Sequence, residues 1–326
     1  MSIKSPLNIV LGAANVGDSS IDKIVRYDTP EQVNAFLNAF YSRGGRQLDT
    51  ARVYSPHASG SSEPRLGAVE AGKRFIIDTK VLSRDPGSHV KDKIEENVNT
   101  SLAELKIPQI NIEYLHQPDR ATPFEETLEA MDKAYKEGKF KQFGLSNYTA
   151  EEVTRIVEIC EEKGFVKPSV YQGQYNPIVR GGEEELFPVL RKHGIAFYAW
   201  SPAAGGFFAG SYKKVEPGGR YDTSHFLGKA YSSGYMKPSI QAATDKAVNL
   251  VAKHGINGHA AALRWTVYHS TLSDKYGDAV IIGASSVAQL NINIDMIEQG
   301  PLPVEVVDAM EEVYKEIGSD SMSYHF

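Results

Sequence analysis

The sequence is poor in cysteine and tryptophan, with one and two copies among 326 residues, and it contains no apolar run near the ~20 residues of a membrane-spanning helix. A single cysteine excludes an intrachain disulfide. Cys160 falls in a helical pattern, so we interpret it as a packing residue. The net charge of −6 provides no overall positive field for nucleic acid or an anionic membrane. Residues 1–7 also lack the hydrophobic stretch of a secretory signal. We therefore expect a cytoplasmic protein with no nucleic-acid or membrane partner.

Short apolar runs alternate with longer segments of helical periodicity along the chain. Hydrophobic residues make up 41% of it, which is enough for one large core. Strands that alternate with helices form a parallel sheet, and eight such units favour closure into a (β/α)8 TIM barrel, an α/β fold. No change in composition marks a second domain, so residues 1–326 are predicted to form a single domain. The predicted strands are 7–11, 46–49, 75–79, 110–115, 141–145, 170–174, 195–200 and 279–282.

Capping residues and glycines mark the expected helix boundaries. Thr29 and Pro30 are typical of a helix start, and Gly138, Gly164 and Gly194 each follow a predicted helix. The longest interruption, residues 203–237, is rich in glycine, serine and tyrosine, and a loop of this length is usually functional. Beyond the helix that begins at residue 30, the periodicity predicts helices at 90–105, 123–137, 150–163, 183–193, 239–253, 259–269, 287–297 and 304–317.

Four polar residues lie at or just beyond predicted strand ends: Asp49, Tyr54, Lys80 and His116. In a barrel the functional groups gather where the strands end, so these side chains are expected to meet. Each alone has an ordinary interpretation, as a helix cap, a half-buried tyrosine, a solvated lysine or a loop histidine. Together they favour a proton-donor site around Tyr54.

The chemistry of such a site follows from its groups. A phenol has a reference pKa of about 10, which is high for proton donation near neutral pH. The ammonium of Lys80 would favour the phenolate and lower the pKa of Tyr54, and Asp49 would position and neutralise Lys80. His116 would donate a hydrogen bond to a substrate oxygen. A general acid beside a group that stabilises an oxyanion suits reduction of a carbonyl. No side chain supplies a hydride, so a nicotinamide cofactor is expected.

The sequence resembles the aldo-keto reductases in a set of specific motifs. These are Asp-Thr-Ala-x-x-Tyr at 49–54, Thr-Lys at 79–80, Leu-His at 115–116, Gly-Leu-Ser-Asn at 144–147 and Ala-Trp-Ser-Pro at 199–202. Segments 197–206 and 282–286 are similar to the branch that contains the aflatoxin aldehyde reductases. The likeness runs from about residue 7 to the end of the chain. It implies that Asp49, Tyr54, Lys80 and His116 form a catalytic tetrad, with Tyr54 as the proton donor.

The resemblance also implies where the cofactor binds. No Gly-x-Gly-x-x-Gly motif follows a strand, which disfavours a Rossmann site. The glycine-rich residues 205–210 would either wrap a pyrophosphate with backbone N–H groups or form a plain flexible loop. The flat face of Trp200 suits stacking on a nicotinamide, and in the family the matching aromatic stacks there. Ser146, Asn147 and Gln172 match residues that hold the carboxamide. The complete predicted set is Ser146, Asn147, Gln172, Trp200, Ser201, Ala203, Gly205, Gly210, Arg220, Gly283, Ser285, Gln289 and Asn293.

One part of this set bears on the choice between NADPH and NADH. Ser285, Ser286, Gln289 and Asn293 match the family's adenosine 2′-phosphate segment, at a helix start that would attract a phosphate. Many relatives carry basic residues at the positions of Gly283 and Gln289, and this chain has none there. We predict NADPH, with the strictness of its preference over NADH left open.

The substrate is expected between Tyr54, His116 and the 203–237 loop, in a lining of Tyr148, Phe207, Phe226, Tyr231, Tyr235 and Phe326. Such a lining suits an aldehyde or ketone with apolar or aromatic substituents. Residues 231–236 lack the arginines that aflatoxin aldehyde reductases carry near this position, which argues against acidic substrates such as succinic semialdehyde. Arg220 remains a candidate to hold pyrophosphate or a substrate anion, and is equally consistent with a solvated side chain.

The leading hypothesis is an NADPH-dependent reductase of aldehydes or ketones, present as a monomer or homodimer. The alternative is a nucleotide-sensing regulatory subunit resembling the potassium-channel β subunits, which keep the same tetrad. The absence of a long N-terminal extension favours the enzyme. A metal site is not expected, because His254 and His259 are five residues apart and no acid completes a ligand set. A glycosidase is disfavoured because Asp49 has no obvious acidic partner.

Overall fold

The computed structural model describes residues 2–326 and shows eight parallel strands closed into a barrel. Each strand pairs with the next along the chain, and the eighth returns to the first, so that Leu11 lies opposite Ile282. The predicted single-domain barrel is therefore confirmed. The strands are β1 (Asn8–Gly12), β2 (Gln47–Asp49), β3 (Ile76–Val81), β4 (Ile110–Leu115), β5 (Phe140–Ser146), β6 (Pro168–Gln174), β7 (Ala196–Trp200) and β8 (Ala279–Ile282).

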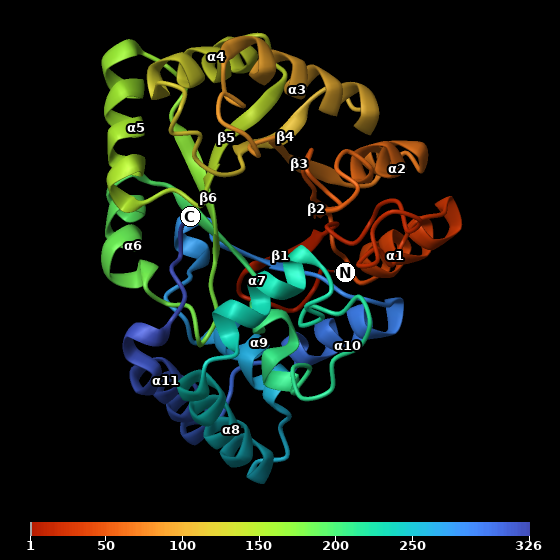
Figure 1. Ribbon diagram of the computed structural model, residues 1–326, viewed down its shortest axis with the longest axis vertical. Coiled ribbons are helices and arrows are strands. Elements are labelled where there is room, and N and C mark those ends of the chain that lie inside the picture. The colour runs from red at the N-terminus through yellow and green to blue at the C-terminus, as the bar shows by residue number, and fades with distance from the viewer. Residues whose placement is uncertain (1) are drawn as a thin grey trace.

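A ring of helices surrounds the barrel (Figure 1). Most of these helices turn a buried stripe toward the strands and an exposed stripe toward water, as the 3.6-residue periodicity predicted, whereas the helix over residues 258–268 has no exposed residue. The ring consists of α1 (Pro30–Ser42), α3 (Lys91–Leu105), α4 (Phe124–Lys136), α5 (Ala150–Lys163), α6 (Gly182–His193), α8 (Pro238–Lys253), α9 (Gly258–Tyr268), α10 (Val287–Glu298) and α11 (Val304–Ile317).

The predicted capping signals act as expected. The Thr29 side chain accepts a hydrogen bond from the Gln32 backbone N–H, and the Gln32 side chain accepts one from the Thr29 N–H, so that α1 begins with a capping box. Gly164 and Gly194 end α5 and α6 with positive φ angles of 68° and 67°. Glycine adopts this left-handed conformation without a steric penalty, so both helices end where the sequence indicated.

Two helices were not predicted, α2 (Ser62–Ala68) and α7 (Phe226–Tyr235). Helix α2 contains a proline and a glycine, and it rests on α3 so closely that a Cβ at Gly67 would lie 1.8 Å from the Glu104 carbonyl oxygen. Helix α7 is capped by the His225 side chain rather than by a serine, threonine or acid. Tertiary packing therefore forms both helices where local signals are weak. The expected loop 203–237 accordingly contains a 3-10 segment at Ala204–Ala209 as well as α7.

The barrel interior has two unlike walls. Side chains alternate along a strand, so every second residue faces inward. Apolar and aromatic residues fill most of the interior: Val10, Ile112, Tyr114, Val170, Ala196, Tyr198, Ala279 and Ile281. The β2–β3 wall instead carries Gln47, Asp49, Asp78 and Lys80, all buried. A separate, larger apolar layer fills the space between the strands and the helices.

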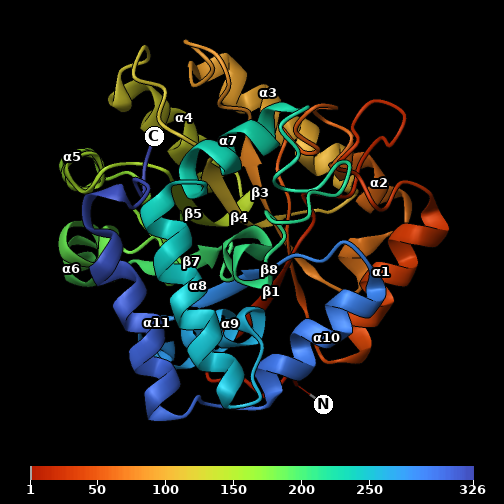
Figure 2. The same ribbon diagram turned by 60° about the horizontal axis from the view of Figure 1, so that its bottom comes forward.

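The ends of the strands define two faces of the molecule. In Figure 2, α7 and its flanking segments lie on the face opposite to the labelled N-terminus. The carboxyl ends of the strands open toward the face covered by α7, where functional groups are expected in this fold. Within residues 2–326, every helix is too short or too polar to cross a bilayer.

Candidate active site

The tetrad's deepest member is Lys80, in β3. Its Nζ donates to both carboxylate oxygens of Asp49, each at 2.8 Å, and to the Thr50 carbonyl oxygen at 2.7 Å. Both partners of this ion pair are buried. Gln172 adds a second donor to Asp49, with its Nε2 at 2.7 Å from Oδ1. The pair is thus hydrogen-bonded on all sides, which is the condition under which buried charge is tolerated.

Asp49 keeps Lys80 charged. Burial by itself would lower the pKa of the Lys80 ammonium, but Asp49 and Tyr54 outweigh it, and the net pKa is raised. The site therefore holds a fixed positive charge whose field is partly cancelled by the carboxylate beside it.

Tyr54 lies in the segment that follows β2 and is brought to the Lys80–Asp49 pair. The Lys80 Nζ is 5.0 Å from the centre of the Tyr54 ring. The His116 ring meets the Tyr54 ring edge-on, at 5.7 Å between centres and 81° between planes. The structure thus brings all four predicted catalytic side chains together, although they come from three strand ends and one loop.

The pKa of Tyr54 differs from the sequence-based expectation. Burial raises this pKa, and Lys80 opposes the rise without overcoming it, because Asp49 offsets the charge of Lys80. The net pKa therefore lies above the usual value rather than below it. Tyr54 consequently keeps its proton at neutral pH, which is the state that a proton donor requires.

His116 is held neutral and fixed in place. Its pKa is lowered well below the usual value, first by burial and then by the charge of Lys80. Its backbone carbonyl oxygen accepts a hydrogen bond from Asn147 Nδ2 at 2.8 Å. A neutral imidazole beside the Tyr54 phenol is able to donate one N–H to a substrate oxygen without bringing a second charge into the site.

The predicted carboxamide-binding residues lie around the same opening. Ser146 ends β5, and the Asn147 side chain bonds to both His116 and Ser146. Gln172 uses one amide N–H on Asp49, and its side-chain carbonyl oxygen accepts no hydrogen bond from residues 2–326, so it is available to a ligand. Trp200 ends β7, packs against the apolar cluster of the barrel interior and is partly exposed.

The glycine-rich segment after β7 adopts conformations that favour glycine. Gly205, Gly206 and Gly210 have φ angles of 61°, 87° and 75°. A Cβ on Gly205 would lie 2.5 Å from the Tyr231 ring, so the close packing of α7 also requires glycine here. Arg220 lies 5.7 Å from the centre of the same ring and is one of the charges that lower the pKa of Tyr54. This arginine therefore belongs to the surroundings of the tetrad.

The expected phosphate segment forms the start of α10. The Ser286 side chain caps the helix by accepting from the Gln289 backbone N–H at 3.1 Å. The Gln289 side chain accepts from the Ser285 N–H at 2.6 Å, and Asn293 is buried against His259. Gly283, Ser285 and Gln289 are exposed. The segment offers polar groups and a helix N-terminus without a basic side chain between residues 283 and 293.

The predicted substrate contacts divide into two groups. Tyr148, Phe207 and Tyr235 are buried, and Tyr235 is bonded to Gln174 and Asn176. Tyr231 is nearly buried, with its hydroxyl 2.7 Å from Ser201 Oγ. Phe226 and Phe326 are 74% and 63% exposed. Substrate contact by all six residues stays a prediction. The buried three would more readily shape the pocket from behind, while Phe226 and Phe326 present their rings to solvent.

A partly buried group of charged residues beside the segment that carries Tyr54 was not predicted. The Arg52 guanidinium contacts both Glu63 and Glu104, and Glu63 accepts from the Thr79 hydroxyl at 2.6 Å. The Arg52 backbone N–H donates to the Lys80 carbonyl oxygen at 3.0 Å. These contacts fasten the segment that carries Tyr54 to strand β3. The only sequence feature that could have indicated this group is Arg52 itself, which occupies the first x of the Asp-Thr-Ala-x-x-Tyr motif.

Asp78 is the second residue that sequence reasoning missed. It lies directly opposite Asp49 in the β2–β3 register, so the expectation that Asp49 has no acidic partner is wrong. Asp78 has no exposed surface, and a buried carboxyl is out of reach of a sugar substrate. A glycosidase therefore gains no support. The sequence feature that could have indicated Asp78 is its position in the predicted strand 75–79, two residues before Lys80.

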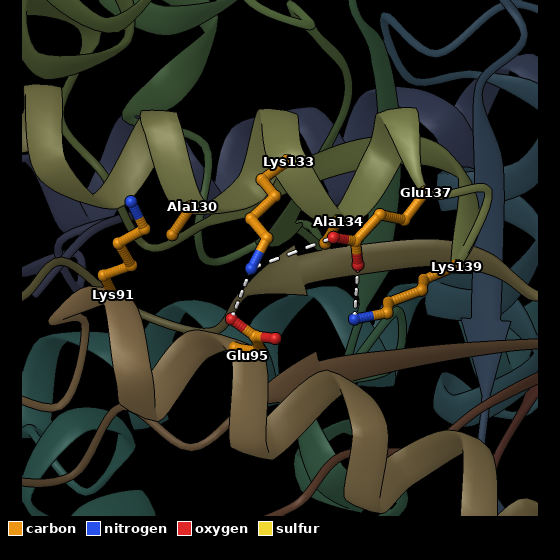
Figure 3. Close-up of a pocket in the computed structure, with 7 residues that line it drawn as sticks. All are labelled: Lys91, Glu95, Ala130, Lys133, Ala134, Glu137 and Lys139. Carbon is orange, nitrogen blue, oxygen red and sulfur yellow. Dashed lines mark hydrogen bonds and ion pairs between the residues drawn. The ribbon is translucent and has the colours of Figure 1, made fainter.

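A surface hollow between α3 and α4 has a different character (Figure 3). Lys133 bonds Glu95 at 2.7 Å, and Lys139 bonds Glu137 at 2.6 Å. These are partly exposed ion pairs, each worth about 0–1 kcal/mol. The hollow lies in the helix ring, apart from the strand ends that carry the tetrad, and we assign it no role. Among residues 2–326, no group of three or more histidine, cysteine or acidic side chains could hold a metal ion.

Comparison with known proteins gives a consistent result. A model of the aldo/keto reductase family matches residues 8–315. Human aflatoxin B1 aldehyde reductase member 2 is 39% identical over 312 residues, which cover 92% of this chain and 86% of that protein. Oxidoreductase sirO of Leptosphaeria maculans is 37% identical over 319 residues, covering 97% and 96%. An aldo-keto reductase of Pseudocercospora fijiensis is 39% identical over 297 residues, covering 88% and 99%.

Proposed function

The chain belongs to the aldo/keto reductase family, and from that premise we propose that it is an NADPH-dependent reductase of aldehydes or ketones with Tyr54 as its proton donor. The observation that carries this proposal is the position of the Tyr54 phenol between the buried Lys80–Asp49 pair and a neutral His116. The family supports an oxidoreductase that reduces carbonyls, and the named residues give that reaction a mechanism.

The residues divide the work as follows. His116 donates an N–H to the carbonyl oxygen of the substrate and orients it toward Tyr54. The Tyr54 hydroxyl transfers its proton to that oxygen as negative charge develops there. Lys80 stabilises the phenolate that remains, and Asp49 with Gln172 holds Lys80 in place. A reduced nicotinamide, when bound, supplies the hydride to the carbonyl carbon.

The residues present fit such a cofactor. Trp200 is partly exposed at the end of β7, and Asn147 and Ser146 present polar groups nearby. The positive-φ glycines of residues 205–210 let a backbone approach a pyrophosphate closely, and Arg220 supplies a cation on the same side. The polar start of α10 suits a phosphate.

We propose NADPH over NADH on this basis, with a smaller preference than a basic side chain at position 289 would give. Tryptophan fluorescence quenching, titrated with each cofactor, measures the preference. Tighter binding of NADH would contradict the choice of NADPH without touching the assignment of the tetrad.

The substrate is proposed to be an aldehyde or ketone with apolar or aromatic substituents. The partly exposed Trp200 and the exposed Phe226 and Phe326 offer apolar surface near the opening. One relative is named as an aldehyde reductase, which favours aldehydes within this class. We expect a cytoplasmic enzyme that acts as a monomer or homodimer.

The test is a panel of aldehydes, ketones and quinones, followed by NADPH consumption, with wild type and Tyr54→Phe. We expect turnover by wild type, a loss of at least about 10²-fold in Tyr54→Phe, and unchanged cofactor quenching in that variant. Tyr135→Phe, on the exposed side of α4, is the matched control and should keep full activity. Full turnover by Tyr54→Phe would refute the proton-donor role, and tight nucleotide binding without turnover would favour a nucleotide-sensing subunit.

A further inference from the structure

A second carboxyl group lies inside the barrel beneath the tetrad. Asp78 and Lys80 are two residues apart in β3, so their side chains leave the strand on the same face. Asp78 is also the register partner of Asp49 on β2. It has no exposed surface. The proposed reaction does not use this group, and an unused buried acid beside a catalytic ion pair requires an account.

Two side-chain amides hold Asp78. Gln47 Nε2 donates to Oδ2 at 2.6 Å, and Asn111 Nδ2 donates to Oδ1 at 2.7 Å. Gln47 is itself positioned by Asn8, whose Nδ2 lies 2.7 Å from Gln47 Oε1. Each carboxyl oxygen thus has one neutral donor. The arrangement stabilises a carboxylate without cancelling its charge, so that an ionised Asp78 acts on its surroundings at full strength.

The charged groups that face Asp78 are few. Asp49 on β2 and Lys80 on β3 are the ionised neighbours, while Tyr114 on β4 and Tyr198 on β7 stay neutral because burial raises the pKa of each phenol. Burial raises the pKa of Asp78 to about 7, against the opposing effect of its amide donors and of Lys80. The charge of Asp78 therefore changes within the ordinary working range of an enzyme.

Solvent comes within one side chain of Asp78 at the end of the barrel remote from the tetrad. Asn111 is partly exposed and lines a cavity of about 230 Å³ with Ile76, Gln109 and Lys141, near the amino-terminal ends of β3, β4 and β5. One amide thus separates Asp78 from water there. Asp78 is placed to exchange its proton with solvent even when ligands cover the opposite face.

We propose that Asp78 is a positioning residue that sets the pH range over which Tyr54 holds the proton for the carbonyl oxygen. Ionised Asp78 adds a negative charge near Lys80, which stabilises the ammonium and disfavours the Tyr54 phenolate. The phenol then keeps its proton to higher pH than Lys80 and Asp49 alone would allow. This inference rests on the proposed role of Tyr54 as proton donor.

The expected size follows from Coulomb's law. A unit charge about 10 Å away, at an effective dielectric constant of about 20, shifts a pKa by roughly one unit. Replacing Asp78 with asparagine keeps the shape and removes the charge. Below about pH 6 the group is neutral in both proteins, so their reactions should match. Above pH 8 the variant should lose reduction activity about one pH unit earlier.

The first experiment compares pH profiles of kcat/KM for carbonyl reduction in wild type, Asp78→Asn and Glu113→Gln. The last variant is a matched control, because Glu113 is an equally buried acid on the neighbouring strand whose raised pKa keeps it uncharged. We expect the alkaline limb to move only in Asp78→Asn, and the rising limb of alcohol oxidation to move with it. An Asp78→Asn profile that coincides with wild type overturns the proposal.

A second variant, Asn111→Ala, tests the proposal even if Asp78→Asn does not fold. Asn111→Ala leaves Asp78 in place but removes one donor, which raises the pKa of Asp78 further. On the rising limb of alcohol oxidation, where the rate follows the fraction of Tyr54 phenolate, Asn111→Ala should follow Asp78→Asn between about pH 7 and 8 and return to wild type at higher pH. Coincidence with wild type throughout that range counts against the proposal.

A measurement without turnover separates this inference from the proposed function. Tyrosine labelled with carbon-13 at Cζ reports the ionisation of each phenol, and the Tyr54 signal is the one missing from Tyr54→Phe. With NADP⁺ bound, its titration midpoint should be lower in Asp78→Asn than in wild type. Equal midpoints refute the role of Asp78 whatever the activity. Inactive wild-type enzyme with shifted midpoints would instead contradict the carbonyl reductase and leave the role of Asp78 supported.

Discussion

The two walls of the barrel interior solve different problems. The wall formed by β6, β7 and β8 is packed with Val170, Ala196, Tyr198, Ala279 and Ile281 and stabilises the barrel by excluding water. The wall formed by β2 and β3 carries Asp49, Asp78 and Lys80, and all three residues are buried. Such a wall contributes little to the stability of the fold, because desolvation offsets much of the attraction between buried charges. Its proposed role is to hold the charges that proton transfer by Tyr54 requires.

The polar wall is kept folded by complete hydrogen bonding. Lys80 uses its donors on Asp49 and Thr50, Asp49 accepts a further bond from Gln172, and Asp78 accepts one bond at each oxygen. The apolar wall, in contrast, is stabilised by close packing of its side chains. The comparison therefore predicts that a change in the polar wall is costly when it leaves a partner behind, whereas a change in the apolar wall costs only lost contact.

The largest effect is expected from Lys80→Met. The substitution keeps the length of the side chain but leaves Asp49 buried without its cation, and removal of one partner of a buried pair costs about 3–5 kcal/mol. Urea unfolding at pH 7 measures the free energy of unfolding. Reductase activity should fall as well, because nothing stabilises the Tyr54 phenolate.

The control for this prediction is Lys133→Met on α4, where the ion pair with Glu95 is 45% and 41% exposed (Figure 3). There the expected loss is below about 1 kcal/mol. Equal losses in the two variants would show that the interior ion pair has no special role and would remove the distinction between the walls.

A smaller effect separates the walls by pH. Asp78 has a folded-state pKa of about 7, raised from 3.8 by burial. The folded protein therefore binds a proton that the unfolded chain has lost between these values, so the contribution of Asp78 to stability is complete below pH 3.8 and declines as pH rises to 7. The slope is at most about 1.4 kcal/mol per pH unit.

The measurement is the free energy of unfolding of wild type and Asp78→Asn from pH 4 to 8. The difference between the two proteins should change across pH 4–7 in favour of the variant and level off above pH 7. A difference that is constant with pH would mean that Asp78 is ionised throughout, and the polar wall would then lack its titrating member.

The barrel could be predicted from sequence because its signals repeat. Eight apolar runs, each followed by a periodic helix, leave few alternatives, and caps such as Thr29 fix local boundaries. Asp49, Tyr54, Lys80 and His116 were found because strand ends converge in a barrel. The family resemblance named the cofactor segments. Helices α2 and α7 were missed because packing against α3 and against the glycine-rich segment, rather than local sequence, determines them.

The charged residues around the tetrad could not be predicted from the sequence, for a different reason. The run that contains Asp78 was identified as a strand, but its acid was not assigned to the interior, since that required the register of β2 against β3. The direction of the Tyr54 pKa also depends on how far burial outweighs Lys80. Both facts depend on distances between residues that are far apart in the sequence.

The smallest effect is expected in the apolar wall, from Ile281→Val. Ile281 is nearly buried, and its Cγ2 would lie 3.2 Å from a Cβ built on Gly12, so it fills the space that this glycine leaves. Removing one methylene should cost about 0.5–1.5 kcal/mol. Because no charge is left behind, the loss should be the same at pH 5 and pH 8, and the pH profile of reduction should not move. Thermal and urea unfolding at both pH values, with kcat/KM measured alongside, check this. A pH-dependent loss, or a shifted alkaline limb, would mean that the apolar wall is electrostatically coupled to Asp78 and Lys80, and the two walls would have to be treated as one.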